Sequence, residues 1–255
     1  MDIFALKLIM APLIIGSASL AGRKWGPAVS GWIVGMPLTS GPVIFFLALS
    51  HDAAFAANTV LGIVSGGLSL ISYALTYAWL ATRFRWYTAL IGSFTVFAIT
   101  TTLLQHIPVP LIPIFIIVFV AIALALRLMP NDEVEEGETK LGRWDIPSRI
   151  LIGTTFILLI TGSASVLGPR LTGLLTMIPL YVTILAIFAH RHQGPAAAAH
   201  VLRGLLYGMF AYAGFFITLG LLLETSGIAF SFVAAIFVAL AIQGISLWIL
   251  RQKHN

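Results

Sequence analysis

The segment 31–42 reads GWIVGMPLTSGP, and the segment 173–184 reads GLLTMIPLYVTI. Each lies in a longer apolar run, 28–49 or 171–189, with Pro37 or Pro179 near the middle of the run. A mid-helix proline removes one backbone hydrogen bond and frees carbonyl groups, which in lipid must face protein or a wet cavity. If both runs cross a membrane, matching interruptions in two halves of a chain indicate a binding site near the membrane midplane.

The composition supports a membrane location. The chain has 255 residues, of which 59% are hydrophobic and 9% charged, and its mean hydropathy is +1.02. A soluble domain is nearer half apolar and a quarter charged, and disorder needs low hydrophobicity with high charge. The composition also disfavours an outer-membrane barrel, because barrel strands alternate apolar and polar residues over short segments. We therefore predict an all-α, polytopic membrane protein.

The apolar runs are long enough for about nine transmembrane helices. They fall at 3–21, 28–49, 57–82, 87–105, 110–129, 149–167, 171–189, 197–222 and 227–250. The runs 57–82 and 197–222 exceed the usual length, so we expect them to be tilted or broken. Between the fifth and sixth runs lies the acidic segment 131–148, which we interpret as a solvated linker.

The positive charges predict the orientation of the helices. With the N-terminus outside, eleven of the 14 Lys and Arg residues lie in inside connections, and outside segments hold only Lys7 and Arg170. The net charge of +5 therefore indicates membrane orientation rather than nucleic-acid binding. An outside N-terminus and a cytoplasmic C-terminus require an odd number of spans, which agrees with nine. The expected location is the cell inner (plasma) membrane. The inside basic residues are Arg23, Lys24, Arg83, Arg85, Arg127, Lys140, Arg143, Arg149, Arg191, Arg251 and Lys253.

An internal repeat relates the two halves of the chain. A constant offset of 142 residues pairs several glycines, prolines and alanines over about 48 residues without a gap, and the GSAS motif at 16–19 recurs at 162–165. Glycine and proline matches carry weight because these residues have positional roles in the backbone. The matched positions include Gly31 with Gly173, Pro37 with Pro179, Phe46 with Phe188, Gly62 with Gly204, and Gly66 with Gly208.

The repeat predicts two inverted halves. Helices 1–4 form repeat 1 (1–105), helices 6–9 form repeat 2 (149–255), and helix 5 with the acidic cytoplasmic loop connects them (106–148). Helix 1 runs inward and helix 6 runs outward, so the halves have opposite topology. Inverted repeats of this kind are typical of secondary transporters.

This four-plus-one-plus-four topology resembles the nine-helix members of the bile-acid/sodium symporter-like superfamily. The resemblance covers the whole topology and implies a ten-helix inverted-repeat fold without its first helix. That family usually coordinates sodium with carboxylates and polar groups in its core, and this chain has no such carboxylates in its spans. The drug/metabolite transporter fold, also built from inverted five-helix units, fits the topology nearly as well.

The candidate substrate-binding residues form two groups. The first flanks the proline breaks, where small polar side chains can supply neutral hydrogen bonds; a proline kink without a ligand is the alternative. The second lies on the third and eighth helices, where Asn58 matches His200 in the repeat. Arg203 lies three residues after His200, on the same face, and could hold an anionic group or extend to the inner headgroups. The candidates are Pro37, Thr39, Ser40, Thr176, Pro179, Tyr181, Thr183, Asn58, His200 and Arg203.

Several chemistries have no candidate residues. All nine acidic residues lie outside the centres of the predicted spans, so a buried carboxylate for proton or sodium coupling is missing. The chain has no cysteine, and no HExxH or Walker pattern occurs. The pairs His51–Asp52 and His190–His192 have no further ligands at suitable spacing. We expect no enzyme activity, no cofactor and no metal.

The prediction is a secondary transporter that moves a small organic, anionic or neutral solute by alternating access. Its expected partners are the lipid bilayer and the solute, with a homo-oligomer left open and no nucleic acid. Two alternatives remain: a structural or accessory subunit of a membrane complex, and a lipid flippase. Substrate identity, direction, coupling ion and the choice between the two candidate groups are not determined by the sequence.

Overall fold

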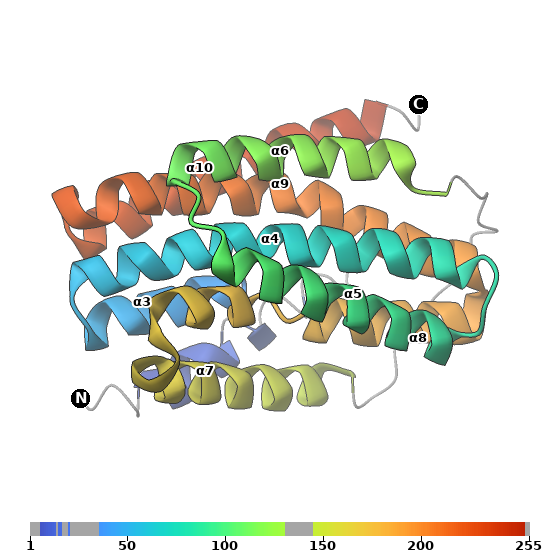
Figure 1. Cartoon of the computed structure of the whole chain (residues 1–255), viewed down its shortest axis with the longest axis horizontal. Coiled ribbons are helices and arrows are strands. Elements are labelled where there is room, and N and C mark those ends of the chain that lie inside the picture. Colours follow the sequence, from blue (N-terminus) through green and yellow to red (C-terminus); the bar gives the residue numbers. More distant parts are fainter. Residues whose placement is uncertain (1–5, 14, 17–19, 21–35, 131–144, 253–255) are drawn as a thin grey trace.

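The computed structural model describes residues 6–13, 15–16, 20, 36–130 and 145–252, and all regular secondary structure in these ranges is helical. Most helices run along the long axis of the molecule, and successive long helices alternate in direction (Figure 1). The labelled helices are α3 (Ser40–Ser50), α4 (Ala53–Ala81), α5 (Trp86–His106), α6 (Leu111–Leu128), α7 (Asp145–Thr176), α8 (Leu180–Gln193), α9 (Pro195–Ser226) and α10 (Ile228–Gln252).

Six helical stretches in the described part of the chain are long and apolar enough to cross a membrane. One of them covers 44 residues, from Ile150 to Gln193, and includes a reversal and a break described below. The chain is therefore an all-helical protein suited to crossing a membrane several times. Of the predicted run 3–21, residues 6–13, 15–16 and 20 are described and helical. The first part of the run 28–49 and the acidic residues 131–144 lie outside the described residues, and α7 already begins at Asp145.

The helix start points repeat along the chain. Helix α9 begins 142 residues after α4, and α10 begins 142 residues after α5, which is the offset found in the sequence. Helices α4 and α9 are each continuous over 29 and 32 residues. Of the two alternatives expected for these long runs, tilted or broken, the structure shows no break. At about 1.5 Å per residue they exceed the hydrocarbon thickness of about 30 Å, so tilting stays a prediction.

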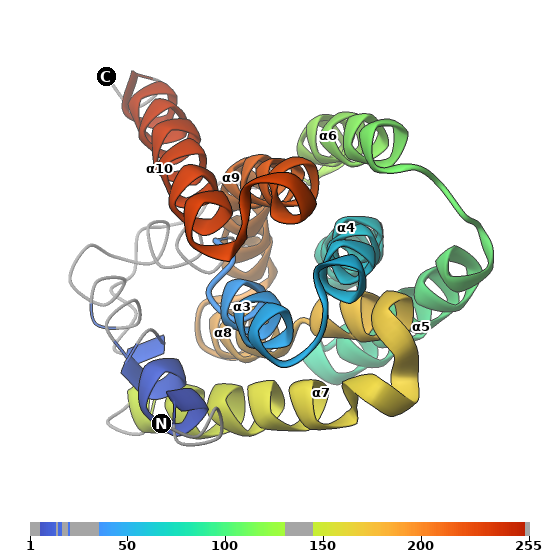
Figure 2. The ribbon, with the colours of Figure 1, turned by 90° about the vertical axis from the view of Figure 1, so that its left-hand side faces the viewer.

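A reversal within α7 separates the predicted runs 149–167 and 171–189. Gly168 has φ 74° and ψ 165°, a backbone conformation that residues with a Cβ rarely adopt, and Pro169 begins the second arm. Figure 2 shows the helix turning sharply at this point. The second arm ends at Thr176, Met177–Pro179 are not helical, and α8 then begins.

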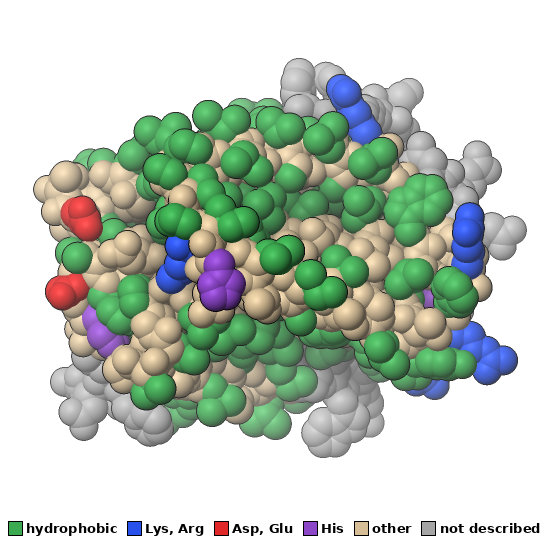
Figure 3. Space-filling view, viewed as in Figure 1, with side chains coloured by type: hydrophobic (Ala, Val, Ile, Leu, Met, Phe, Trp, Pro, Cys, Tyr) green, Lys and Arg blue, Asp and Glu red, His purple; other side chains and the backbone are tan. Residues whose placement is uncertain are grey.

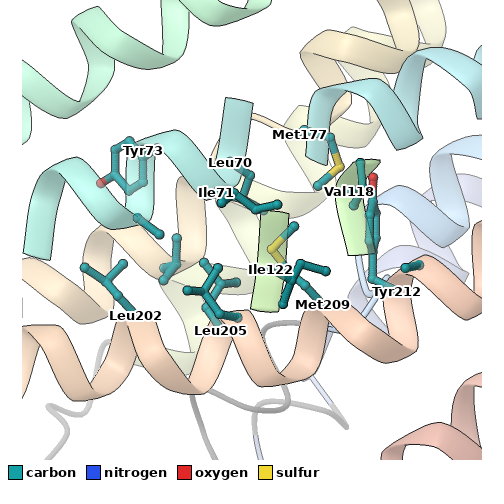
Figure 4. Packing of buried hydrophobic residues seen from close by; sticks show 14 of the residues in the cluster. Leu70, Ile71, Tyr73, Val118, Ile122, Met177, Leu202, Leu205, Met209 and Tyr212 are labelled. Carbon is teal, nitrogen blue, oxygen red and sulfur yellow. The ribbon is translucent and has the colours of Figure 1, made fainter. Parts of the chain in front are cut away.

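Helices α4 and α9 form the centre of the molecule. In their apolar windows 67% and 61% of the residues are buried, against 22% in α5 and α6 and 28% in α10. Figure 4 shows the core between them, where Leu70 and Ile71 of α4 lie opposite Leu205 and Met209 of α9. The outer helices expose isoleucine, leucine and phenylalanine side chains, as expected for helices in contact with lipid.

The charged side chains on the surface are separated along the long axis of the molecule. On the face in Figure 3, hydrophobic side chains dominate, the acidic side chains lie at one end and most of the basic ones at the other. The acidic end includes Asp52, before α4, and Glu224, near the end of α9. Arg83 and Arg85 lie between α4 and α5, at the opposite end.

A stripe of glycines brings α4 against the second arm of α7. A Cβ added at Gly62 would lie 2.3 Å from the Arg170 carbonyl oxygen, and one at Gly173 would lie 2.3 Å from that of Thr59. Gly66 meets Met177 in the same interface. These contacts agree with a packing role for Gly62 and Gly66, and they fix the second arm of α7, which leads to the break before α8, against the central helix.

Candidate substrate cavity

A small cavity lies where the two proline-containing segments meet the central helices. Its volume is about 50 Å³, room for a few water molecules. The segments on either side of the α7–α8 break and before α3 form much of the wall, and α4 and α9 supply the rest. The lining residues are Met36, Thr39, Ser40, Leu70, Thr176, Met177, Ile178, Pro179, Leu180, Tyr181, Val182, Leu205, Met209 and Tyr212.

Two helices begin at this cavity. Residues 36–39 form a bend and turn before α3, and Pro179 immediately precedes α8. Neither Thr39 nor Pro179, the N-cap residues, makes a side-chain capping hydrogen bond. The first N–H groups of a helix have no partner inside it, and the helix dipole places partial positive charge at this end. Two helix N-termini at one cavity favour an anionic or hydrogen-bond-accepting ligand.

Small polar side chains contribute to the wall. Ser40 is only 4% exposed and lines the cavity. Thr176 is 2% exposed, and its hydroxyl donates to the Thr172 carbonyl at 2.7 Å. The Tyr212 hydroxyl donates to the Ile63 carbonyl, which fixes its ring at the cavity wall. Thr39 and Ser40 therefore add neutral hydroxyl groups to the wall beside the start of α3.

The structure brings most of the first group of predicted residues together. Thr39, Ser40, Thr176, Pro179 and Tyr181 all line the cavity. The Tyr181 hydroxyl lies against Gly153 of α7, because a Cβ at that glycine would overlap it.

The other two members of this group lie next to the cavity. Pro37 lies between the lining residues Met36 and Thr39, and its carbonyl accepts from the Gly41 N–H at 2.8 Å. The Thr183 hydroxyl lies one turn further along α8, 2.7 Å from the Tyr73 hydroxyl of α4.

The second group of predicted residues lies elsewhere. Asn58 is exposed, and its amide donates to the Ala54 carbonyl at 2.9 Å. His200 is exposed as well. The Arg203 guanidinium donates to the Pro130 carbonyl at 3.0 Å and to the Met129 carbonyl at 3.4 Å. These carbonyls end α6, and a cation is favoured at the C-terminus of a helix. Arg203 therefore binds a neighbouring helix end.

Apolar residues of the cavity were missed in the sequence. Leu205, Met209 and Tyr212 follow the i, i+4, i+7 spacing of one helix face, but any core face shows that pattern. Met177 lies directly before the break, and flexible methionine side chains adapt to irregular cavities. The helical spacing and the methionine are visible in the sequence. They do not distinguish residues of a cavity wall from residues of an ordinary hydrophobic core.

None of the described residues that line the cavity is acidic. The Asp52 side chain accepts from the Phe55 N–H at 2.6 Å and caps α4. Within the described residues there is also no cluster of three His, Asp or Glu side chains that could hold a metal ion. The described groups of the site are thus neutral side chains and backbone dipoles.

No family model, no curated protein and no solved structure matches the chain.

Proposed function

We propose that the protein is a secondary transporter of the inner membrane that moves a small organic, anionic or neutral solute by alternating access. The observation that carries the proposal is the cavity at which two helices begin after non-helical, proline-containing residues, α3 after Thr39 and α8 after Pro179. The two prolines, Pro37 and Pro179, lie 142 residues apart. Broken helices that meet at a shared cavity are the usual construction of a carrier's substrate site.

The positions and directions of the helices support this proposal. Helices α4 and α9 begin at equivalent positions of the 142-residue offset, as do α5 and α10, and each pair runs in opposite directions (Figure 1). Opposite direction at equivalent positions is what two inverted halves require. In this proposal nine helices form two four-helix repeats around a connecting helix, with the N-terminus outside and the C-terminus in the cytoplasm.

The cavity is smaller than a site for an organic solute. Sites for organic ligands usually occupy about 300 Å³ or more, whereas this cavity has about 50 Å³. A solute therefore enters only after the segments around the breaks move apart. The wall suits such movement, because non-helical residues such as Met36 and Ile178 lie at both breaks.

Cysteine labelling tests the proposal directly, because the chain has no native cysteine. We expect Thr39→Cys and Thr176→Cys to react with membrane-impermeant thiol reagents from at least one side of the membrane. The matched control is Ser93→Cys, a fully buried polar position on α5 that does not line the cavity, and it should stay unreactive. Failure of both cavity cysteines to react from either side would contradict a transport site and favour an accessory subunit.

A further inference from the structure

A second group of polar side chains continues from the cavity toward the basic end of the molecule. Tyr73 and Tyr77 lie one turn apart on α4, and Thr183 and His190 lie two turns apart on α8, so each pair shares one helix face. The Tyr73 hydroxyl meets the Thr183 hydroxyl at 2.7 Å. Beyond it the rings of Tyr77 and His190 pack edge to face, with centroids 6.1 Å apart.

These side chains bridge two helices that are not closely packed. In the described residues, α4 packs along α5, α7 and α9, and α8 packs along α9, but the α4 and α8 backbones make at most isolated close approaches. The long tyrosine side chains therefore fill the space between α4 and α8. Such a space opens when a side chain changes rotamer, without separation of tightly packed backbones.

Two atoms in this space have unmet hydrogen-bonding capacity. The Tyr77 hydroxyl and the His190 Nδ1 are both buried and both lack a hydrogen-bond partner. Burying a polar group without a partner is unfavourable, so a water molecule or a ligand group is the usual explanation for such an atom. The neighbouring rings place both atoms in the same part of the interface.

The inner end of this interface carries positive charge. Arg191 follows His190, and its guanidinium lies 5.6 Å from the centre of the Trp86 ring at the start of α5. Arg83 and Arg85 precede that ring in sequence. A cationic entrance of this kind raises the local concentration of anions.

We propose that the α4–α8 interface is the inner half of the solute path. The Tyr73–Thr183 hydrogen bond closes the cavity on this side. Tyr77 and His190 form a second binding station, occupied by water at rest and by an oxyanion or another hydrogen-bond-accepting group of the solute during transit. The Tyr77 hydroxyl donates to that group, and His190 donates from Nδ1 in the tautomer or charge state that carries a proton there. This inference rests on the proposed transport function and adds a route and a solute chemistry to it.

The first experiment maps the route with an impermeant sulfonate thiol reagent applied to inside-out vesicles. We expect Tyr77→Cys and Thr39→Cys to react, and Ala78→Cys, a fully buried neighbour of Tyr77 on another face of α4, to stay unreactive. If Thr39→Cys reacts from the inner side while Tyr77→Cys does not, the route is wrong and the transport function stands. If neither Thr39→Cys nor Thr176→Cys reacts from either side, the proposed function and this inference fail together.

The second experiment separates a binding station from a structural role. Tyr77→Phe removes an unpartnered buried hydroxyl, so the melting temperature should stay the same or rise. We expect the sulfonate to label Thr39→Cys from the inner side about two- to tenfold more slowly in this background, the range that one lost hydrogen bond gives. A cationic ammonium reagent should be slowed less.

The control for this experiment is Thr154→Val. It also removes an unpartnered buried hydroxyl, but on α7 and outside the proposed route. Its melting temperature should likewise hold, and its sulfonate labelling rate should be unchanged. Equal labelling rates in the Tyr77→Phe variant and the parent would contradict a second binding site at Tyr77 and His190.

Discussion

Gly62 and Gly173 show how closely α4 and the second arm of α7 approach. Each glycine faces backbone atoms of the other helix, which cannot move aside as a flexible side chain does. We expect Gly173→Ala to destabilise the protein by about 1–3 kcal/mol, the usual cost of overpacking a tight contact. Thermal unfolding in detergent measures this change.

Gly162→Ala is the matched control for that substitution. It lies in the first arm of α7, where an added Cβ meets nothing within 4 Å. Its melting temperature should stay level or rise slightly, because alanine is the better helix former. Equal melting temperatures for the two variants would contradict the backbone contact at Gly173.

The Arg203 guanidinium binds backbone carbonyls at the end of a neighbouring helix, which gives it a structural role without a solute. Its hydrogen bonds to the last carbonyls of α6 predict that Arg203→Gln lowers stability by about 1.5–3 kcal/mol, the range for bonds to a charged group. Thermal unfolding checks the loss, and thiol labelling at Thr39→Cys should be unchanged. Unaltered stability together with lost solute binding would instead support the anion-binding role considered from the sequence.

At the scale of single residues, sequence reasoning worked where backbone chemistry sets the position. Pro179 directly precedes α8, Pro37 lies in the non-helical residues before α3, and polar residues beside both prolines line the cavity. Asn58 and Arg203 were candidates because polar groups are rare in membrane helices, a criterion that does not distinguish a ligand site from a helix end. Tyr77 received no role, because its lack of a partner depends on which residues of α8 face it.

At the scale of elements, Pro179 keeps the second arm of α7 and α8 from forming one helix. A proline disfavours helical backbone at the residue before it and clashes with the preceding turn. We expect Pro179→Ala to extend helix through the break and narrow the cavity, which should slow thiol labelling of Thr39→Cys at least about tenfold. The melting temperature should hold or rise, because an interior proline costs a helix about 3 kcal/mol.

Pro113→Ala is the control for the break. This proline lies in the first turn of α6, where its missing N–H has no partner within the helix. Labelling of Thr39→Cys should be unaffected in that variant. If Pro179→Ala labels as fast as Pro113→Ala, the break does not depend on the proline.

The elements themselves were predictable to different degrees. Helices α4, α5, α6 and α9 match apolar runs of the sequence, because length and hydropathy determine a membrane helix locally. The reversal at Gly168 coincides with the gap between two runs. The continuity of α4 and α9 was not predictable, since packing on both sides determines whether a long helix stays intact.

At the scale of the whole molecule, the distribution of charge predicts how the protein sits in the membrane. Arg83 and Arg85 lie in the connection between α4 and α5, whereas Glu224 lies near the opposite end, close to the turn between α9 and α10. Positive loops stay on the cytoplasmic side during insertion. The connection at 82–85 should therefore face the cytoplasm, and the turn at Ser226 and Gly227 should face the outside.

Two single-cysteine variants test this orientation. Phe84→Cys lies in the basic connection, where Phe84 is 50% exposed, and Ser226→Cys lies at the exposed end of α9. An impermeant reagent should label Phe84→Cys only in inside-out vesicles and Ser226→Cys only in intact cells or spheroplasts. Labelling in the reverse pattern would mean that the protein has the opposite orientation in the membrane. The α4–α8 route would then lead to the outside. Labelling of both positions from one side would contradict α9 as a spanning helix, because its full length separates the basic end from the acidic end.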